Sequence, residues 1–242
     1  MDEYTFSFKD VDELEFKLSE SNSKYEYNGK IVPRVTSVIS TMIHEDGLMY
    51  WSNKLGFHHQ SYKQVMNEAL DYGTKTHHGI EIFLKESRIE ESAPYFSITA
   101  FIHWWNNLIS HNVVQILGQE IPVVCQYYGG TYDLLISING EPWLIDFKTS
   151  NHITYKYFLQ LAAYNRVLRD EQNIHLKGVC ILQLSKTSPS FNEYALNFSN
   201  PCHKAYIDDS ERTFMSLLYS YYHIKYMEDV SKHVLERKTS EK

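Results

Sequence analysis

Two carboxylates and an ammonium lie close together in the middle of this sequence. Lys148 follows Asp146 by two positions, so in a strand both side chains point to the same face of the sheet. Asp133 belongs to the apolar run just before them. Two carboxylates that converge beside a lysine can hold a divalent cation and support metal-assisted hydrolysis of a phosphodiester. Asp133, Asp146 and Lys148 are therefore the first candidate catalytic residues.

A predicted hairpin brings the two aspartates together. Asn139-Gly140 separates two apolar runs, which indicates a two-residue turn because both turn residues need positive φ. When Ile138 is paired with Glu141 and the register is counted outward, Asp133 falls directly opposite Asp146. Like charges opposed across a sheet are destabilising, and a bound cation would remove that penalty. The alternative is a pair of surface carboxylates at a strand end, although Asp is disfavoured in strands and needs a partner after an apolar run.

Glu120 and His77 are two further candidates for a metal site. Glu120 lies near the start of the strand expected to pair with the hairpin, where it is either a solvated strand-end charge or a group that touches the metal or its water shell. His77 ends the segment Gly73-Thr-Lys-Thr-His in a helical stretch, and a neutral imidazole nitrogen can bind a metal. A lone helical histidine is more often a polar neighbour, and the adjacent His78 leaves the choice open.

Polar residues beyond Lys148 could contact a substrate. Gln160 and Tyr164 are spaced i, i+4, so they share one face of the predicted helix. They are either the polar flank of a core helix or groups that hydrogen-bond a phosphate or orient Lys148. Thr149 and Ser150 directly follow the lysine and could contact a phosphate or cap a turn.

The composition bounds the class of protein. The chain has 242 residues, of which 43% are hydrophobic and 19 are tyrosines, enough for one large domain with a full core or a core with an added subdomain. A net charge of −7 argues against a general DNA coat protein, because such binding is driven by basic surface, but it does not exclude a nuclease with an acidic metal site. No apolar run approaches transmembrane length and the N-terminus does not resemble a signal peptide, so a soluble, cytoplasmic protein is expected.

Several other chemistries are not supported by the sequence. The three cysteines are odd in number and far apart, which suits neither a disulfide framework nor a four-cysteine iron–sulfur cluster. The histidines lack zinc-site spacing with cysteines, and no phosphate-binding GxxxxGK[ST] loop is present.

The pattern of apolar residues predicts an α/β fold, with a central mixed sheet flanked by helices. Thr36 or Ser37 is the expected N-cap of an early helix, and Ala69 and Ile80 are expected in the core, with Trp51, Leu55, Val65 and Leu84. We expect an N-terminal hairpin and helical cap over residues 1–96, a core over 97–230 and a polar tail over 231–242. The expected elements are a hairpin over 25–32, helices over 48–84, 97–111, 155–169 and 210–230, and strands over 113–126, 131–138, 142–148, 177–184 and 194–198.

The ordered motifs resemble the PD-(D/E)xK nuclease superfamily, in particular its RecB-type branch. Residues 32–39 and 145–150 are also similar to the mitochondrial genome maintenance exonuclease and related phage exonucleases, and the resemblance covers about residues 32–184. The motifs are, in order, Gly73-Thr-x-x-His77, Glu120, Gly130-x-x-Asp133, Asp146-Phe-Lys148-Thr-Ser and Gln160-x-x-x-Tyr164.

This resemblance implies an αβββαβ nuclease core and one or two Mg²⁺ or Mn²⁺ ions. It makes His77, Asp133 and Asp146 metal ligands together with the backbone carbonyl of Phe147, and it makes Lys148 the catalytic lysine. Glu120 matches a position whose role varies among members. Some relatives add a four-cysteine iron–sulfur staple, which this chain cannot form.

The function expected on these grounds is metal-dependent exonucleolytic hydrolysis of DNA, on single strands or strand ends. Lys75, with Tyr62 and Lys63, is expected to line a passage for one strand. DNA is the expected partner, with replication, repair or recombination proteins in a phage or bacterial cytoplasm. The alternatives are a structure-selective endonuclease with the same site and a catalytically inactive DNA-binding or assembly subunit.

Overall fold

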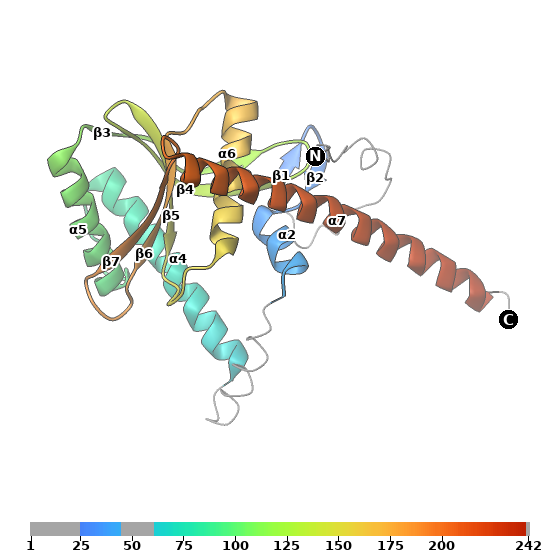
Figure 1. Ribbon diagram of the computed structural model, residues 1–242. Helices are drawn as coiled ribbons and strands as arrows, with labels where there is room; N and C mark the ends of the chain where they lie inside the picture. The colour runs from blue at the N-terminus through green and yellow to red at the C-terminus, as the bar shows by residue number, and fades with distance from the viewer. Residues whose placement is uncertain (1–24, 45–60, 241–242) are drawn as a thin grey trace.

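The structure is a computed structural model that describes residues 25–44 and 61–240 (Figure 1). Its centre is a five-stranded mixed sheet in the order β3-β4-β5-β6-β7, in which only β5 and β6 are parallel. A separate two-stranded hairpin, β1-β2, precedes it. The α/β class and the mixed sheet were predicted from the sequence. The strands are β1 (Tyr25–Tyr27), β2 (Lys30–Val32), β3 (Val114–Val124), β4 (Gly129–Ile138), β5 (Glu141–Lys148), β6 (Gly178–Leu184) and β7 (Phe191–Asn197).

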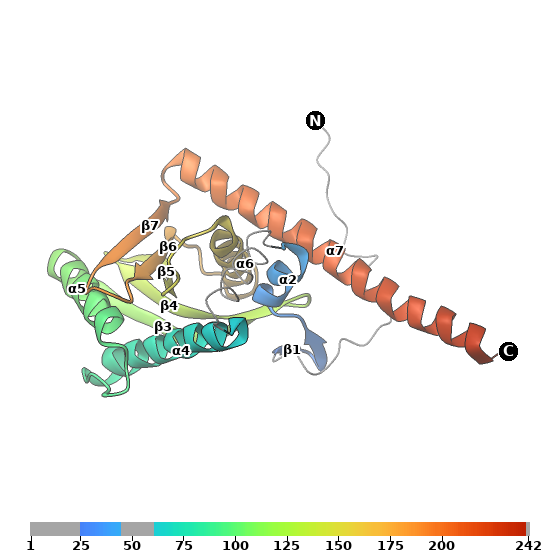
Figure 2. The same cartoon turned by 90° about the horizontal axis from the view of Figure 1, so that it is seen from below.

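Helices cover both faces of the sheet (Figures 1 and 2). On one face, α4 and α5 enclose a core that includes Phe101, Ile136 and Phe147. On the other face, α2, α6 and α7 enclose a second core that includes Leu161 and Phe214. Neighbouring strand residues such as Leu134 and Leu135 enter different cores because successive side chains point to opposite faces. The helices are α2 (Val35–Met42), α4 (Tyr62–Glu86), α5 (Tyr95–His111), α6 (Tyr155–Gln172) and α7 (Pro201–Ser240).

The hairpin register was predicted correctly. Asn139 and Gly140 both have positive φ, and Ile138 pairs with Glu141. The same register continues to the pair of Leu134 and Ile145, one step before the two aspartates. The Asn28-Gly29 turn of the first hairpin is also confirmed, again with positive φ at both residues.

Several boundaries differ from the expectations. Helix α2 begins at Val35, and its N-cap is Arg34 with no side-chain cap, so neither Thr36 nor Ser37 caps it. Ala69 is exposed, whereas Ile80 is fully buried as expected. Trp51 and Leu55 lie outside the described residues.

The last helix is longer than predicted. It starts at Pro201 and runs through Ser240, so most of the expected polar tail is helical. Its first part packs on α6 and α2, and its C-terminal part extends beyond the rest of the molecule (Figures 1 and 2). None of the helices that the structure describes is long and apolar enough to cross a membrane.

Candidate metal centre

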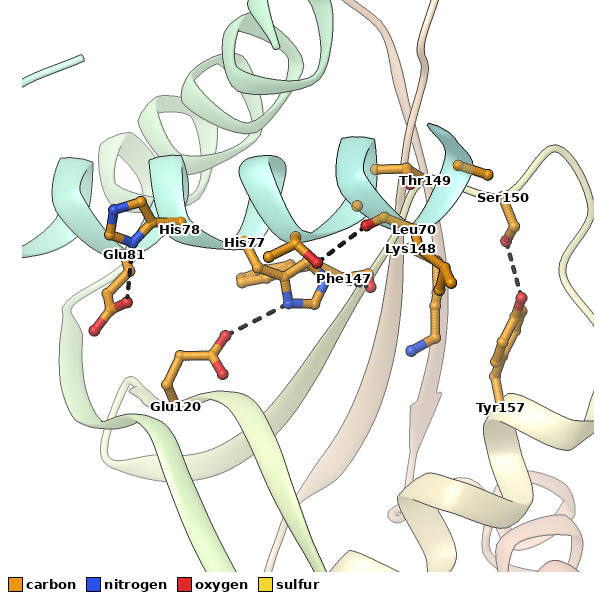
Figure 3. A pocket seen from close by; sticks show the side chains of 13 residues that line it. Leu70, His77, His78, Glu81, Glu120, Phe147, Lys148, Thr149, Ser150 and Tyr157 are labelled. Carbon is orange, nitrogen blue, oxygen red and sulfur yellow. Dashed lines mark hydrogen bonds and ion pairs between the residues drawn. The ribbon is translucent and has the colours of Figure 1, made fainter. Parts of the chain in front are cut away.

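A cavity of about 600 Å³ opens where α4 crosses the ends of β3 and β5 (Figure 3). Leu70 and His77 reach it from α4, Glu120 from β3, Lys148 from the end of β5, and Tyr157 from the first turn of α6. Four separate elements therefore supply its walls. Thr149 and Ser150, directly after β5, also line it, as expected for groups near a substrate.

His77, Glu120 and Asp133 form the centre of this site. The Nδ1 atom of His77 lies 3.4 Å from Oε1 of Glu120 and 3.4 Å from Oδ1 of Asp133. One ligand atom from each residue lies within 4.8 Å of the other two, a spacing that can hold a metal ion. Glu120, the least certain candidate in the sequence, thus joins the histidine and the first aspartate.

Asp133 is held in place by the backbone of β5. Its Oδ2 accepts a hydrogen bond from the N–H of Phe147 at 2.6 Å, and the carboxylate is buried. Burial opposes ionisation, but the positive charges of His77 and Lys148 and this N–H outweigh it and lower the pKa of Asp133. Asp133 is therefore an ionised carboxylate at neutral pH.

The imidazole of His77 bridges the two carboxylates and the main chain. Its Nε2 donates to the carbonyl oxygen of Phe147 at 3.1 Å, on the side of the ring away from Asp133 and Glu120. Burial disfavours the imidazolium, yet Asp133 and then Glu120 raise the pKa of His77 well above its usual value. The Phe147 carbonyl, an expected ligand, is thus engaged with His77 rather than turned toward the carboxylate pair.

Asp146 faces Lys148 and the helix behind it. Its Oδ2 lies 2.7 Å from the Lys148 ammonium and has no further partner among the described residues, while Oδ1 accepts from Gln160 at 3.1 Å. Burial raises the pKa of Asp146 to about 6, against the effect of Lys148 and with the help of Asp133. Burial also opposes the charge of Lys148, but Asp146 and Asp133 raise its pKa.

Glu120 has an unusual backbone. Its φ is +49°, a left-handed backbone conformation that residues other than Gly, Asn and Asp rarely adopt. The neighbouring pairs, Gln119 with Leu134 and Ile121 with Tyr132, keep one register, so Glu120 stands across from Asp133, although these two residues do not form a ladder pair. Strained residues of this kind concentrate at functional sites. The sequence gives no signal for the positive φ of Glu120, because the residue type Glu does not indicate a left-handed backbone.

Gln160 and Tyr164 lie behind the site instead of facing its open side. Both side chains are buried, and the Gln160 amide donates to Asp146 and, at 3.4 Å, to the Tyr164 hydroxyl. The Tyr164 ring packs so closely on Gly130 that an added Cβ would lie 2.2 Å from it. The i, i+4 pairing is confirmed, but the expected phosphate contact is not available to buried groups. They orient Asp146.

Lys75 lies outside the cavity. It forms an ion pair with Asp71 at 2.7 Å on the exposed surface of α4, one turn away. At 100° per residue its side chain points away from the face that carries Gly73 and His77. The expectation that Lys75 lines a strand passage is therefore not met in this structure.

Tyr157 lines the cavity and was not among the residues predicted from the sequence. Its ring lies 4.9 Å from the Lys148 ammonium, and its hydroxyl donates to Oγ of Ser150 at 3.1 Å. The signal was present, because Tyr157 precedes Gln160 by three residues and helical neighbours at that spacing share a face.

Comparison with known proteins adds little to this geometry. No protein-family model and no curated protein matches the chain. The solved structure of SSO0001 is similar over 86% of this chain and 82% of its own, with a TM-score of 0.40 and 16% sequence identity. A likeness this distant carries no argument about function.

Proposed function

We propose that this protein is a metal-dependent deoxyribonuclease, an exonuclease that hydrolyses phosphodiester bonds of single-stranded DNA or strand ends. The observation that supports it is the convergence of His77, Glu120 and Asp133 within 4.8 Å beside the ion pair of Asp146 and Lys148. His77, Glu120 and Lys148 line an open cavity, where a substrate could reach them, and the two aspartates are buried beside them. The proposal includes a PD-(D/E)xK core for the sheet and its helices.

The donor set fits Mg²⁺ or Mn²⁺. Carboxylate oxygens suit these hard ions, and one imidazole nitrogen is compatible with Mn²⁺ in particular. The buried Oδ2 of Asp146 is paired with Lys148 and has no hydrogen-bond partner among the described residues, so it marks a position where a cation would satisfy a carboxylate. In the proposed site His77, Glu120 and Asp133 would hold the ion, and Asp146 would join them through Oδ2. When bound, the ion would polarise the phosphate and lower the pKa of a coordinated water.

The residues of the chain have separate roles in this proposal. Lys148 keeps its positive charge through its ion pair and places it beside the carboxylates, where it stabilises the negative charge that builds on the phosphate. Gln160 fixes the Asp146 carboxylate from behind. The hydroxyls of Thr149 and Ser150 line the cavity and offer hydrogen bonds to a phosphate of the strand.

The deciding experiment is a digestion time course. Linear single-stranded and double-stranded DNA, labelled at the 5′ or the 3′ end, is incubated with protein and Mg²⁺, Mn²⁺ or EDTA. We expect metal-dependent release of short products, faster from single strands. Products of intermediate length from the first time points would favour the structure-selective endonuclease. The absence of cleavage with either metal, together with retained DNA binding, would favour the inactive binding subunit.

A further inference from the structure

The Lys148 ammonium has one ion-pair partner, and part of the Lys148 side chain is exposed to the cavity. Its ammonium carries three N–H groups, and the ion pair with Asp146 at 2.7 Å occupies one direction. Among the described residues no other hydrogen-bond acceptor holds it, and 18% of its side chain is exposed to the cavity. A lysine on a flexible four-carbon chain that is held at one point can swing away from the reacting phosphate.

The ring of Tyr157 closes the side of the ammonium next to α6. The Lys148 Nζ atom lies 4.9 Å from the ring centroid, within the range of a cation–π interaction, and the two side chains lie side by side in Figure 3. An aromatic face attracts the cation without accepting a directed hydrogen bond. The remaining N–H groups are therefore left to point into the cavity.

A chain of hydrogen bonds links the Tyr157 hydroxyl to the Ser150 segment. The Tyr157 hydroxyl donates to Ser150 Oγ at 3.1 Å, and the Ser150 carbonyl accepts from the Gln183 side chain at 2.8 Å. The Gln183 oxygen in turn accepts from Asn192 and, at 3.3 Å, from Tyr194 on β7. The Ser150 segment is thus tied to β6 and β7, and the Tyr157 hydroxyl adds one contact to it, while the ring itself is carried by the first turn of α6.

We propose that Tyr157 is a positioning residue, which holds the Lys148 ammonium over the cavity by its aromatic face. This inference rests on the proposed nuclease function, in which Lys148 acts on the phosphate. Nothing in it requires Tyr157 to touch the DNA. Its ring should matter for turnover, while its hydroxyl should matter mainly for the order of the Ser150 segment.

The test uses three variants of the full chain. Tyr157→Leu removes the ring, and Tyr157→Phe keeps the ring and removes the hydroxyl. Tyr155→Leu is the matched control, since Tyr155 is 53% exposed two residues away on the same helix and does not line the cavity. We expect Tyr157→Leu to lower kcat about tenfold with little change in KM, which corresponds to about 1.4 kcal/mol. Tyr157→Phe and Tyr155→Leu should keep kcat within about twofold of the wild type, a change of about 0.4 kcal/mol.

A second readout does not depend on activity. In protein carrying ¹³C-labelled lysine, the ε-methylene of Lys148, assigned with Lys148→Ala, should be shifted upfield by the Tyr157 ring. The shift should be lost in Tyr157→Leu and kept in Tyr157→Phe. An unshifted Lys148 resonance in the wild type, or a Phe variant as slow as the Leu variant, would overturn the inference. If the wild type cleaves no DNA, the nuclease proposal fails, and the resonance alone decides whether the ring holds the lysine.

Discussion

Replacing Asp146 by Asn should remove catalysis and yet stabilise the protein that lacks metal. Burial raises the pKa of Asp146 from 3.8 to about 6, so the folded protein holds this proton more tightly than the unfolded chain. The penalty for ionisation is absent below pH 3.8, grows as the pH rises to about 6, and is constant above that. It is at most about 3 kcal/mol, because one pKa unit corresponds to about 1.36 kcal/mol, and the Asn variant also loses the ion pair that supports the buried charge of Lys148.

The assay is thermal unfolding of the wild type and the Asn variant in EDTA, at pH 4 and at pH 7.5. For a chain of this size 1 kcal/mol shifts the midpoint by roughly 2–4 °C, so the variant should melt higher at pH 7.5, by at most about 6–12 °C, and within about 2 °C of the wild type at pH 4. Cleavage with Mg²⁺ or Mn²⁺ should fall by at least about 100-fold, as expected for loss of a group that stabilises the transition state.

Asp133→Asn is the matched control, because the pKa of Asp133 is lowered and its ionised form already stabilises the fold. This variant should gain no stability at pH 7.5, even though an Asn oxygen can still accept from the Phe147 N–H. An Asp146→Asn variant with an unchanged midpoint at pH 7.5, or with an equal gain at both pH values, would refute the electrostatic reasoning. A variant that cleaves at the rate of the wild type would remove Asp146 from the catalytic site.

Three further predictions follow from the site. Lys148→Ala should keep metal affinity, measured by calorimetry, within about threefold and lose at least about 100-fold in kcat; loss of metal binding with retained turnover at saturating metal would contradict the role of this lysine. A covalently closed single-stranded circle should survive conditions that degrade its linear form, and comparable rates on gels would show an endonuclease. Gly130→Ala should destabilise the fold by about 1–3 kcal/mol in chemical denaturation, because its Cβ would overlap the Tyr164 ring; Gly73→Ala, whose Cβ would lie 3.7 Å from Thr149 Oγ1, is the control that should be tolerated.

The sheet and its hairpin could be predicted because they depend on local signals. The Asn139-Gly140 turn fixes the register, and a register fixed at the turn determines which residues oppose one another far along the ladder. For this reason the turn register alone predicted that Asp133 and Asp146 oppose each other. Alternation along the strands then explains why neighbouring residues enter different cores.

The helix that crosses the site could not be placed in the same way. Periodicity identified α4, but it does not tell which part of a long helix is covered by the rest of the chain, so Ala69 was assigned to the core and Lys75 to a passage for a DNA strand. The turned backbone at Glu120 depends on its tertiary surroundings. For Gln160 and Tyr164, the spacing predicted the shared face, whereas burial decided that they serve Asp146 instead of a phosphate.

The position of His77 has a consequence for the helix that carries it. In the proposed centre His77 comes from α4, whereas Glu120, Asp133 and Asp146 come from three adjacent strands of the sheet. A cation shared among them would cross-link α4 to β3, β4 and β5 over the open side of the cavity. The free energy of ion binding would then oppose local opening of this helix. The catalytic activity and the resistance of α4 to local opening would therefore both increase with the metal concentration.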